Sequence, residues 1–231
     1  MMLLRFNYPV GKTIKYISKS NTVRQISKAV EIIDMSRFLY FTQVELKTIA
    51  KDEEGFHIRV RVSNRQSDEN IDEEIKTVII PVNNHTIYML VDELGNILDS
   101  AGSQEVSTLV FPEYEIEVGN YWTSTIKFNL PGYNKYLDIN MNYVVKKVEN
   151  DIIYIEGKSL ETSTSIPIDM EIVSGQKKVL QGSFVVSIES YFEFDTSIGT
   201  NRLQELNIDS IIKVEDYVME NNINNIVKIV E

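Results

Sequence analysis

The stretch that decides the fold is Phe184-Val-Val-Ser-Ile-Glu-Ser-Tyr-Phe-Glu-Phe194. Successive side chains of a β-strand point to opposite faces of its sheet, so residues two apart share a face. One face here carries Ser190 and five large apolar side chains, which are Phe184, Val186, Ile188, Phe192 and Phe194. The opposite face carries polar residues such as Ser187, Glu189 and Glu193. This alternation predicts a strand with one buried face.

The same alternation recurs in three further segments, 56–62, 122–130 and 137–145. Turn-forming residues lie between such runs, at Asp52–Gly55, Asp92–Gly95, Leu130–Gly132, Glu149–Asp151, Ser174–Gly175 and Asp195–Gly199. Parallel strands would need long crossover helices, which the pattern does not indicate. The sequence therefore predicts an all-β fold, an antiparallel meander that forms a curved sheet, a sandwich or an incomplete barrel. We expect about half of the residues in strands, above the usual 20–25% or so.

Two segments carry competing signals. In Thr22–Ile33 the apolar residues are spaced by three and four, which is typical of a helix, so helix and strand both stay open there. The Asn-rich stretch Asn221–Asn225 predicts a turn before a last short strand, Ile226–Val230. The acidic segment Ser67–Lys76 predicts a loop.

Three features occur in the same order in each half of the chain. Val10-Gly11 before Thr13–Tyr16 matches Val118-Gly119 before Thr125–Phe128. Val44–Ile58 matches Tyr143–Tyr154, and Tyr88–Gly95 matches Tyr191–Gly199. We therefore predict two duplicated halves, residues 1–105 and 106–231, which form either two β repeats or one continuous domain.

Composition and charge narrow the class of protein. The 231 residues are 43% hydrophobic and 25% charged, as in an ordinary globular protein. The net charge of −11 disfavours nucleic acid as a partner, and no stretch is long and apolar enough to predict a membrane span. The chain as written, without a signal peptide at Met1–Pro9, is expected in the cytoplasm; a leader trimmed from it would place it outside.

Site chemistry is sparse. The sequence has no cysteine, and His57 and His85 lack neighbours at metal or triad spacing. Asp68–Asp72 imitates the start of a calcium loop, but Glu73 and Ile79 stand where glycine and glutamate are needed. Asp92 and Asp195 are expected to accept hydrogen bonds within turns. We predict no catalytic residues, no metal, no cofactor and no enzymatic activity.

Aromatic residues gather around the single tryptophan. The candidates for binding a ligand or a partner are Tyr114, Tyr121, Trp122, Tyr133 and Tyr136. The alternative is structural: Trp122 and Phe128 belong to the core, and the tyrosines cover faces of the sheet.

Several short motifs carry a resemblance that spans most of the chain: Phe111-Pro-Glu113 before Val118-Gly119 and Trp122, and Leu4–Tyr8 before Gly11. With the Asp-to-Gly turns, they resemble a broad group of uncharacterised bacterial β-repeat proteins, some of which look like lipoprotein carriers of the outer-membrane sorting type. The resemblance implies a curved, incompletely closed antiparallel barrel with an apolar concave face. The chain departs from the group because it has no lipidated cysteine and no export signal.

These observations favour a non-enzymatic binding or scaffold protein whose partner is an unknown protein or an apolar small molecule. The alternative is a carrier of an apolar ligand such as lipid or lipoprotein acyl chains, and a hydrolase with an unrecognised site is more remote. The two leading alternatives differ in the core. We expect bulky residues to fill it, whereas a carrier would keep a cavity of at least about 300 Å³.

Overall fold

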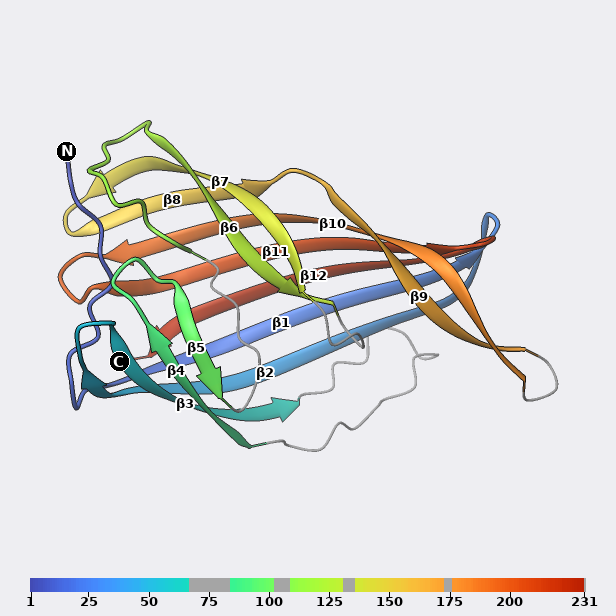
Figure 1. Ribbon diagram of the computed structural model, residues 1–231, viewed down its shortest axis with the longest axis horizontal. Coiled ribbons are helices and arrows are strands. Elements are labelled where there is room, and N and C mark those ends of the chain that lie inside the picture. Colours follow the sequence, from blue (N-terminus) through green and yellow to red (C-terminus); the bar gives the residue numbers. More distant parts are fainter. Residues whose placement is uncertain (67–83, 102–108, 131–135, 173–175, 231) are drawn as a thin grey trace.

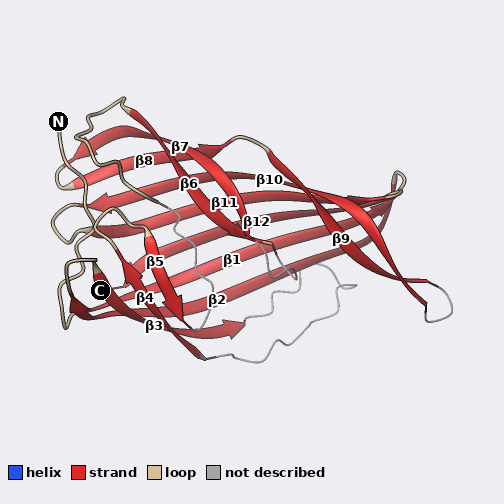
Figure 2. Cartoon of the chain, viewed as in Figure 1, coloured by secondary structure: helices blue, strands red, loops and turns tan. Residues whose placement is uncertain are grey.

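The computed structural model describes residues 1–66, 84–101, 109–130, 136–172 and 176–230. Predictions for the segments 67–83, 131–135 and 173–175, including Tyr133, the calcium-like run and two of the turns, lie outside the described residues. The described chain forms strands and no helix (Figure 2). The strands are β1 (Thr13–Lys28), β2 (Glu31–Lys51), β3 (Phe56–Gln66), β4 (His85–Val91), β5 (Ile97–Ala101), β6 (Tyr121–Asn129), β7 (Tyr136–Glu149), β8 (Ile152–Ser159), β9 (Thr162–Ile172), β10 (Gln176–Asp195), β11 (Thr200–Val214) and β12 (Tyr217–Val230).

All twelve strands belong to one antiparallel sheet, as the alternation predicted. Its order is β5-β4-β3-β2-β1-β12-β11-β10-β8-β7-β6, and β9 pairs with the part of β10 that β8 leaves free. The sheet is strongly curved, and β2 and β10 are its longest strands (Figure 1). No ladder joins β5 to β6 within the described residues, so the sheet is an incomplete ring of strands.

The two ambiguous segments are both strand. Residues 22–28 continue β1, which turns at Ala29-Val30 into β2, so the helical spacing of Thr22–Ile33 is misleading. Residues 221–225 lie in the middle of β12, so the predicted turn is wrong there. Their amides find partners on the next strand: Asn222 Nδ2 donates to Asp209 Oδ1 at 2.6 Å, and Asn224 Nδ2 donates to Asn207 Oδ1 at 2.7 Å. Cross-strand bonds of this kind offset the turn preference of asparagine.

A filled core lies on the inner face of β6, β7, β8 and β10. The alternating residues of the deciding stretch, Phe184, Val186, Ile188, Phe192 and Phe194, are all at most 3% exposed. They pack with Trp122, Ile139 and Tyr143 from the neighbouring strands. In this half of the sheet the predicted filling by bulky side chains is confirmed.

The N-terminal residues 2–8 form a strap across one end of the sheet, where the blue trace begins in Figure 1. Phe6 N–H donates to Glu93 O, and Asn7 N–H donates to Gly199 O, both at 2.8 Å. A Cβ at Gly95 would lie 2.6 Å from the Phe6 ring, so glycine leaves room for the strap there. Gly95 and Gly199 also have positive φ values of 96° and 68°, which confirms the predicted turn conformation.

The matched segments fall on corresponding strands in the same order, β1 with β6, β2–β3 with β7–β8, and β4–β5 with β10–β11. Gly11 N–H donates to Thr48 O on β2, and Gly119 N–H donates to Val145 O on β7. A register shift follows each acceptor, between Thr48 and Ala50 and between Val145 and Lys147. Duplication of the halves stays a prediction, with these details in its favour.

Candidate functional site

A cavity of about 490 Å³ lies on the inner face of the other half of the sheet. Its walls come from β2, β3 and β4, and the apolar residues there are Val44, Leu46, Ile58, Val60, Val62, Met89 and Val91. Three of these wall residues, Ile58, Val60 and Val91, form one buried cluster with Phe56 and Ile87. The described residues therefore leave space on the inner face of this half, and the filled core stays a prediction for it.

The floor of the cavity is polar. It is formed where β1 pairs with β12 and β12 pairs with β11, and it carries Tyr16, Ser18, Thr200, Asn201, Gln204 and Asn225. The hydroxyls of Tyr16 and Thr200 are hydrogen-bonded at 2.9 Å, and Ser18 Oγ donates to Asn225 Oδ1 at 2.7 Å. Burial raises the pKa of Tyr16 to about 12, against a smaller opposing effect of the Thr200 hydrogen bond. The floor therefore offers hydroxyl and amide groups in a poorly hydrated setting.

One polar atom of this floor has no partner. Asn201 Oδ1 is buried and accepts no hydrogen bond, although most buried polar side-chain atoms in proteins are paired. Asn201 lies on β11 opposite Phe194, next to the register shift that separates this pair from Glu193 and Leu203. The bulge sets the direction of the side chains that follow the turn, as bulges near binding sites commonly do.

Charges are absent from the lining. Among the described residues that line the cavity there is no Lys, Arg, Asp or Glu, and His85 is the one imidazole. His85 is exposed and is the first residue of β4. The cavity is therefore suited to an uncharged ligand.

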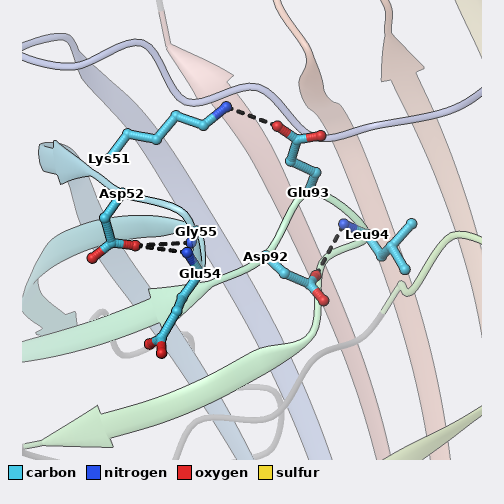
Figure 3. A network of polar contacts seen from close by, with 7 residues as sticks. All are labelled: Lys51, Asp52, Glu54, Gly55, Asp92, Glu93 and Leu94. Atoms are coloured by element: carbon cyan, nitrogen blue, oxygen red, sulfur yellow. Dashed lines mark hydrogen bonds and ion pairs between the residues drawn. The ribbon is translucent and has the colours of Figure 1, made fainter.

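Turns close the end of the sheet near the strap (Figure 3). Asp92 Oδ1 accepts from the N–H groups of Leu94 and Asn96 at 2.9 and 2.8 Å, and Asp195 Oδ1 accepts from Ser197 N–H at 2.9 Å. The predicted turn role of both aspartates is confirmed. Lys51 Nζ lies 2.7 Å from Glu93 Oε1 and links the β2–β3 turn to the β4–β5 turn.

His57 lies on the outer face, is half exposed and contacts Asp52. Its Nε2 lies 2.5 Å from Asp52 Oδ2, and Asp52 Oδ1 accepts from Glu54 and Gly55 N–H. These hydrogen bonds, that from His57 foremost, hold the pKa of Asp52 below its usual range. The pair belongs to the β2–β3 turn and does not line the cavity.

The aromatic candidates do not converge on the cavity. Trp122 is 4% exposed in the filled core, and its Nε1 donates to Val110 O at 2.8 Å. Tyr114, Tyr121 and Tyr136 are 56%, 74% and 37% exposed. Of these, Tyr121 borders a shallow hollow on the outer face with Glu156, Lys158 and Tyr191. The alternative assignment is therefore right for Trp122.

The cavity-lining residues Tyr16, Thr200, Asn201, Gln204 and Asn225 were missed in the sequence. They come from strands far apart in the chain, and no spacing rule connects them. Their one local signal is the presence of polar residues on the face where apolar ones are expected, as at Gln204 and Asn225.

The outer face carries a continuous polar row. Direct cross-strand neighbours in it are Asn21, Asn224, Asn207, Glu189, Lys158, Asn142 and Thr123, from β1 to β6. Lys158 Nζ lies 2.6 Å from Glu189 Oε1, and Thr123 Oγ1 donates to Asn142 Oδ1 at 2.8 Å. This row gives the middle of the outer face a polar surface.

Within the described ranges there is no group of three or more His, Asp or Glu side chains that could hold a metal ion. Among the same residues, no helix has the length and apolarity that a membrane span requires.

Comparisons with known proteins name no family. No family model matches the chain, and no curated protein matches it. Among solved structures, one match is Ail, the attachment invasion locus protein of Yersinia pestis, in complex with the heparin analogue sucrose octasulfate. It is 8% identical, with 95% of this chain and 99% of that chain covered and a TM-score of 0.26, and it carries no argument about this protein. The resemblance to lipoprotein carriers gains no support from these comparisons.

Proposed function

We propose that this chain is a non-enzymatic binding protein that holds an apolar small molecule in the cavity beside β1–β4. The observation that carries the proposal is the cavity itself, about 490 Å³ with an apolar wall. This volume is within the range of small-molecule sites, which are commonly 300–1,000 Å³ or so and mostly apolar.

The surroundings of the cavity support the proposal. The filled cluster around Phe192 and Phe194 lies in the other half of the sheet, whereas the smaller cluster of Ile58, Val60 and Val91 borders the cavity. Val62 and Met89 are partly buried in the cavity wall, and contact of their apolar surface with water forfeits roughly 25 cal/mol per Å². An apolar occupant recovers that free energy.

The first test measures what the purified protein carries. Native mass spectrometry followed by solvent extraction is expected to show an apolar molecule at near-equal stoichiometry. After removal of that molecule, the uncharged dye N-phenylnaphthylamine is expected to bind and to fluoresce. A protein that carries nothing and leaves the dye dark would contradict the proposal.

A matched pair of variants places binding in the cavity. Val62→Phe fills part of the space and is expected to weaken dye binding at least about tenfold, because overpacking excludes the dye. Val148→Phe adds the same bulk at a residue 41% exposed on β7, away from the cavity, and is expected to bind like the parent protein. Equal weakening in both variants would place the dye elsewhere.

A further inference from the structure

The buried acceptor on the cavity floor bears on the chemistry of the ligand. Asn201 Oδ1 is buried and has no hydrogen-bond partner, and the residue lines the cavity. A buried acceptor that has lost water is costly unless a donor reaches it. The space in front of this floor is where an occupant would supply that donor.

Hydroxyl groups of the floor make hydrogen bonds that do not include Asn201 Oδ1. Tyr16 and Thr200 are hydrogen-bonded to each other, and Ser18 Oγ donates to Asn225 Oδ1. Neither bond, at 2.9 and 2.7 Å, involves Asn201 Oδ1, which has no hydrogen-bond partner among the described residues. The described floor therefore contains an acceptor that its own neighbours leave unsatisfied.

The charge of the ligand follows from the lining. The described lining residues include no acidic side chain and no Lys or Arg, so no ion pair awaits a charged group. Burying an unpaired charge costs far more than burying a neutral hydroxyl. The polar end of the ligand must then be uncharged.

We infer that the ligand is an apolar chain ending in an uncharged hydroxyl group, whose O–H donates to Asn201 Oδ1. Long-chain alcohols and acylglycerols with a free hydroxyl are of this class. The inference rests on the proposed function, because it assigns the polar end of the molecule held in the same cavity.

The experiment compares three probes of equal chain length: dodecanol, dodecyl methyl ether and dodecanoate at about pH 8, where the carboxyl group is ionised. Each displaces N-phenylnaphthylamine from the full chain. Dodecanol is expected to bind about tenfold more tightly than the ether, which accepts but does not donate a hydrogen bond. Dodecanoate is expected to bind more weakly than dodecanol, because its charge has no partner.

Asn201→Leu keeps the size of the side chain and removes the acceptor. We expect this variant to bind the ether as the parent protein does and to lose the preference for dodecanol. Asn140→Leu is the matched control, because Asn140 is exposed on β7 and its Oδ1 accepts from Thr125 on the outer face. The control is expected to keep the tenfold preference.

The outcomes separate the two proposals. If no probe binds, the proposed function itself is wrong. If the three bind equally, or if dodecanoate binds best, the cavity still holds an apolar molecule but the hydroxyl inference is overturned. If Asn201→Leu retains the preference for dodecanol, the hydroxyl group of the ligand donates to another acceptor and the assignment to Asn201 is overturned.

Discussion

Asn201 lowers the free energy of unfolding of the ligand-free protein, because its buried Oδ1 has lost its contact with water and has no hydrogen-bond partner in the protein. Asn201→Leu is therefore expected to raise the free energy of unfolding of the ligand-free protein by about 1 kcal/mol. Asn140→Leu, on the solvated face, is expected to change it by less than about 0.5 kcal/mol. Urea unfolding followed by circular dichroism measures both, and a loss of stability in Asn201→Leu would show that the oxygen is satisfied in solution.

Because of Tyr16, the free energy of unfolding is expected to depend on pH at alkaline values. Burial raises the pKa of Tyr16 in the folded state to about 12, whereas the unfolded value is near 10. As the pH rises, Tyr16 loses its proton in the unfolded chain before it does so in the folded protein. The contribution of protonated Tyr16 to the free energy of unfolding is therefore intact below about pH 10 and is lost between about pH 10 and 12. Its slope there is roughly −1.4 kcal/mol per pH unit.

Tyr16→Phe tests this contribution. At pH 7 the variant is expected to be about 1 kcal/mol less stable, because the hydrogen bond with Thr200 is lost. Between about pH 10 and 12 its stability is expected to fall less steeply than that of the parent, so the difference narrows. Urea midpoints across this range measure the effect, and parallel curves for the two proteins would argue against a buried Tyr16.

At the scale of elements, the β4–β5 turn and the N-terminal strap depend on one glycine. Gly95 has a φ of 96°, and a Cβ there would also meet the Phe6 ring and, at 2.7 Å, Leu109 O. Gly119 has a similar φ of 87° but no atom within 4 Å of a Cβ. Gly119→Ala thus isolates the conformational cost, about 1 kcal/mol.

Gly95→Ala is expected to cost about 1–3 kcal/mol more than Gly119→Ala, because the strap must shift away from the added methyl group. Thermal and urea unfolding of both variants measure the difference. Equal losses in the two variants would mean that the strap does not press on this turn in solution.

The strands show how much of the fold can be predicted from the sequence. The alternation of apolar and polar residues located the strands of the filled core. Inward residues of these strands, such as Phe192, are buried by side chains of neighbouring strands. It failed at Asn221–Asn225, where asparagine amides are satisfied by Asn207 and Asp209 of another strand. Local preference for a turn was overridden by partners that only the sheet order brings close.

The candidate site was less accessible to prediction than the strands. Its polar floor joins Tyr16 near the start of the chain with Thr200 and Asn225, and it exists because β1 pairs with β12. No periodicity reveals that pairing. The aromatic cluster around Trp122 drew attention because aromatic residues line many pockets, but here they fill the core.

At the scale of the whole molecule, the two predicted halves meet in one backbone ladder. Fourteen residues of β1, Lys15–Lys28, pair with β12, so neither half ends at a free edge there. We expect the filled cluster and the cluster beside the cavity to unfold together as one cooperative unit.

Ile87→Ala tests whether the two clusters unfold together. Ile87 is fully buried in the cluster beside the cavity, whereas Trp122, the single tryptophan, reports on the other cluster. The substitution is expected to cost about 2–5 kcal/mol. The midpoint measured by Trp122 fluorescence should fall as far as that measured by circular dichroism. A tryptophan midpoint unchanged from the parent would show two independent units.

The pairing of β1 with β12 affects how the chain can fold while it is being translated. Translation produces β1 well before β12, yet Lys15 pairs with Val230 and Tyr16 with Ile229. During elongation one long edge of β1 stays without its neighbour, and such an edge is a template for pairing with other nascent chains. Pairings so distant in sequence also form slowly. The protein therefore spends its most aggregation-prone interval on the ribosome, and a premature stop codon ahead of β12 would make that interval permanent.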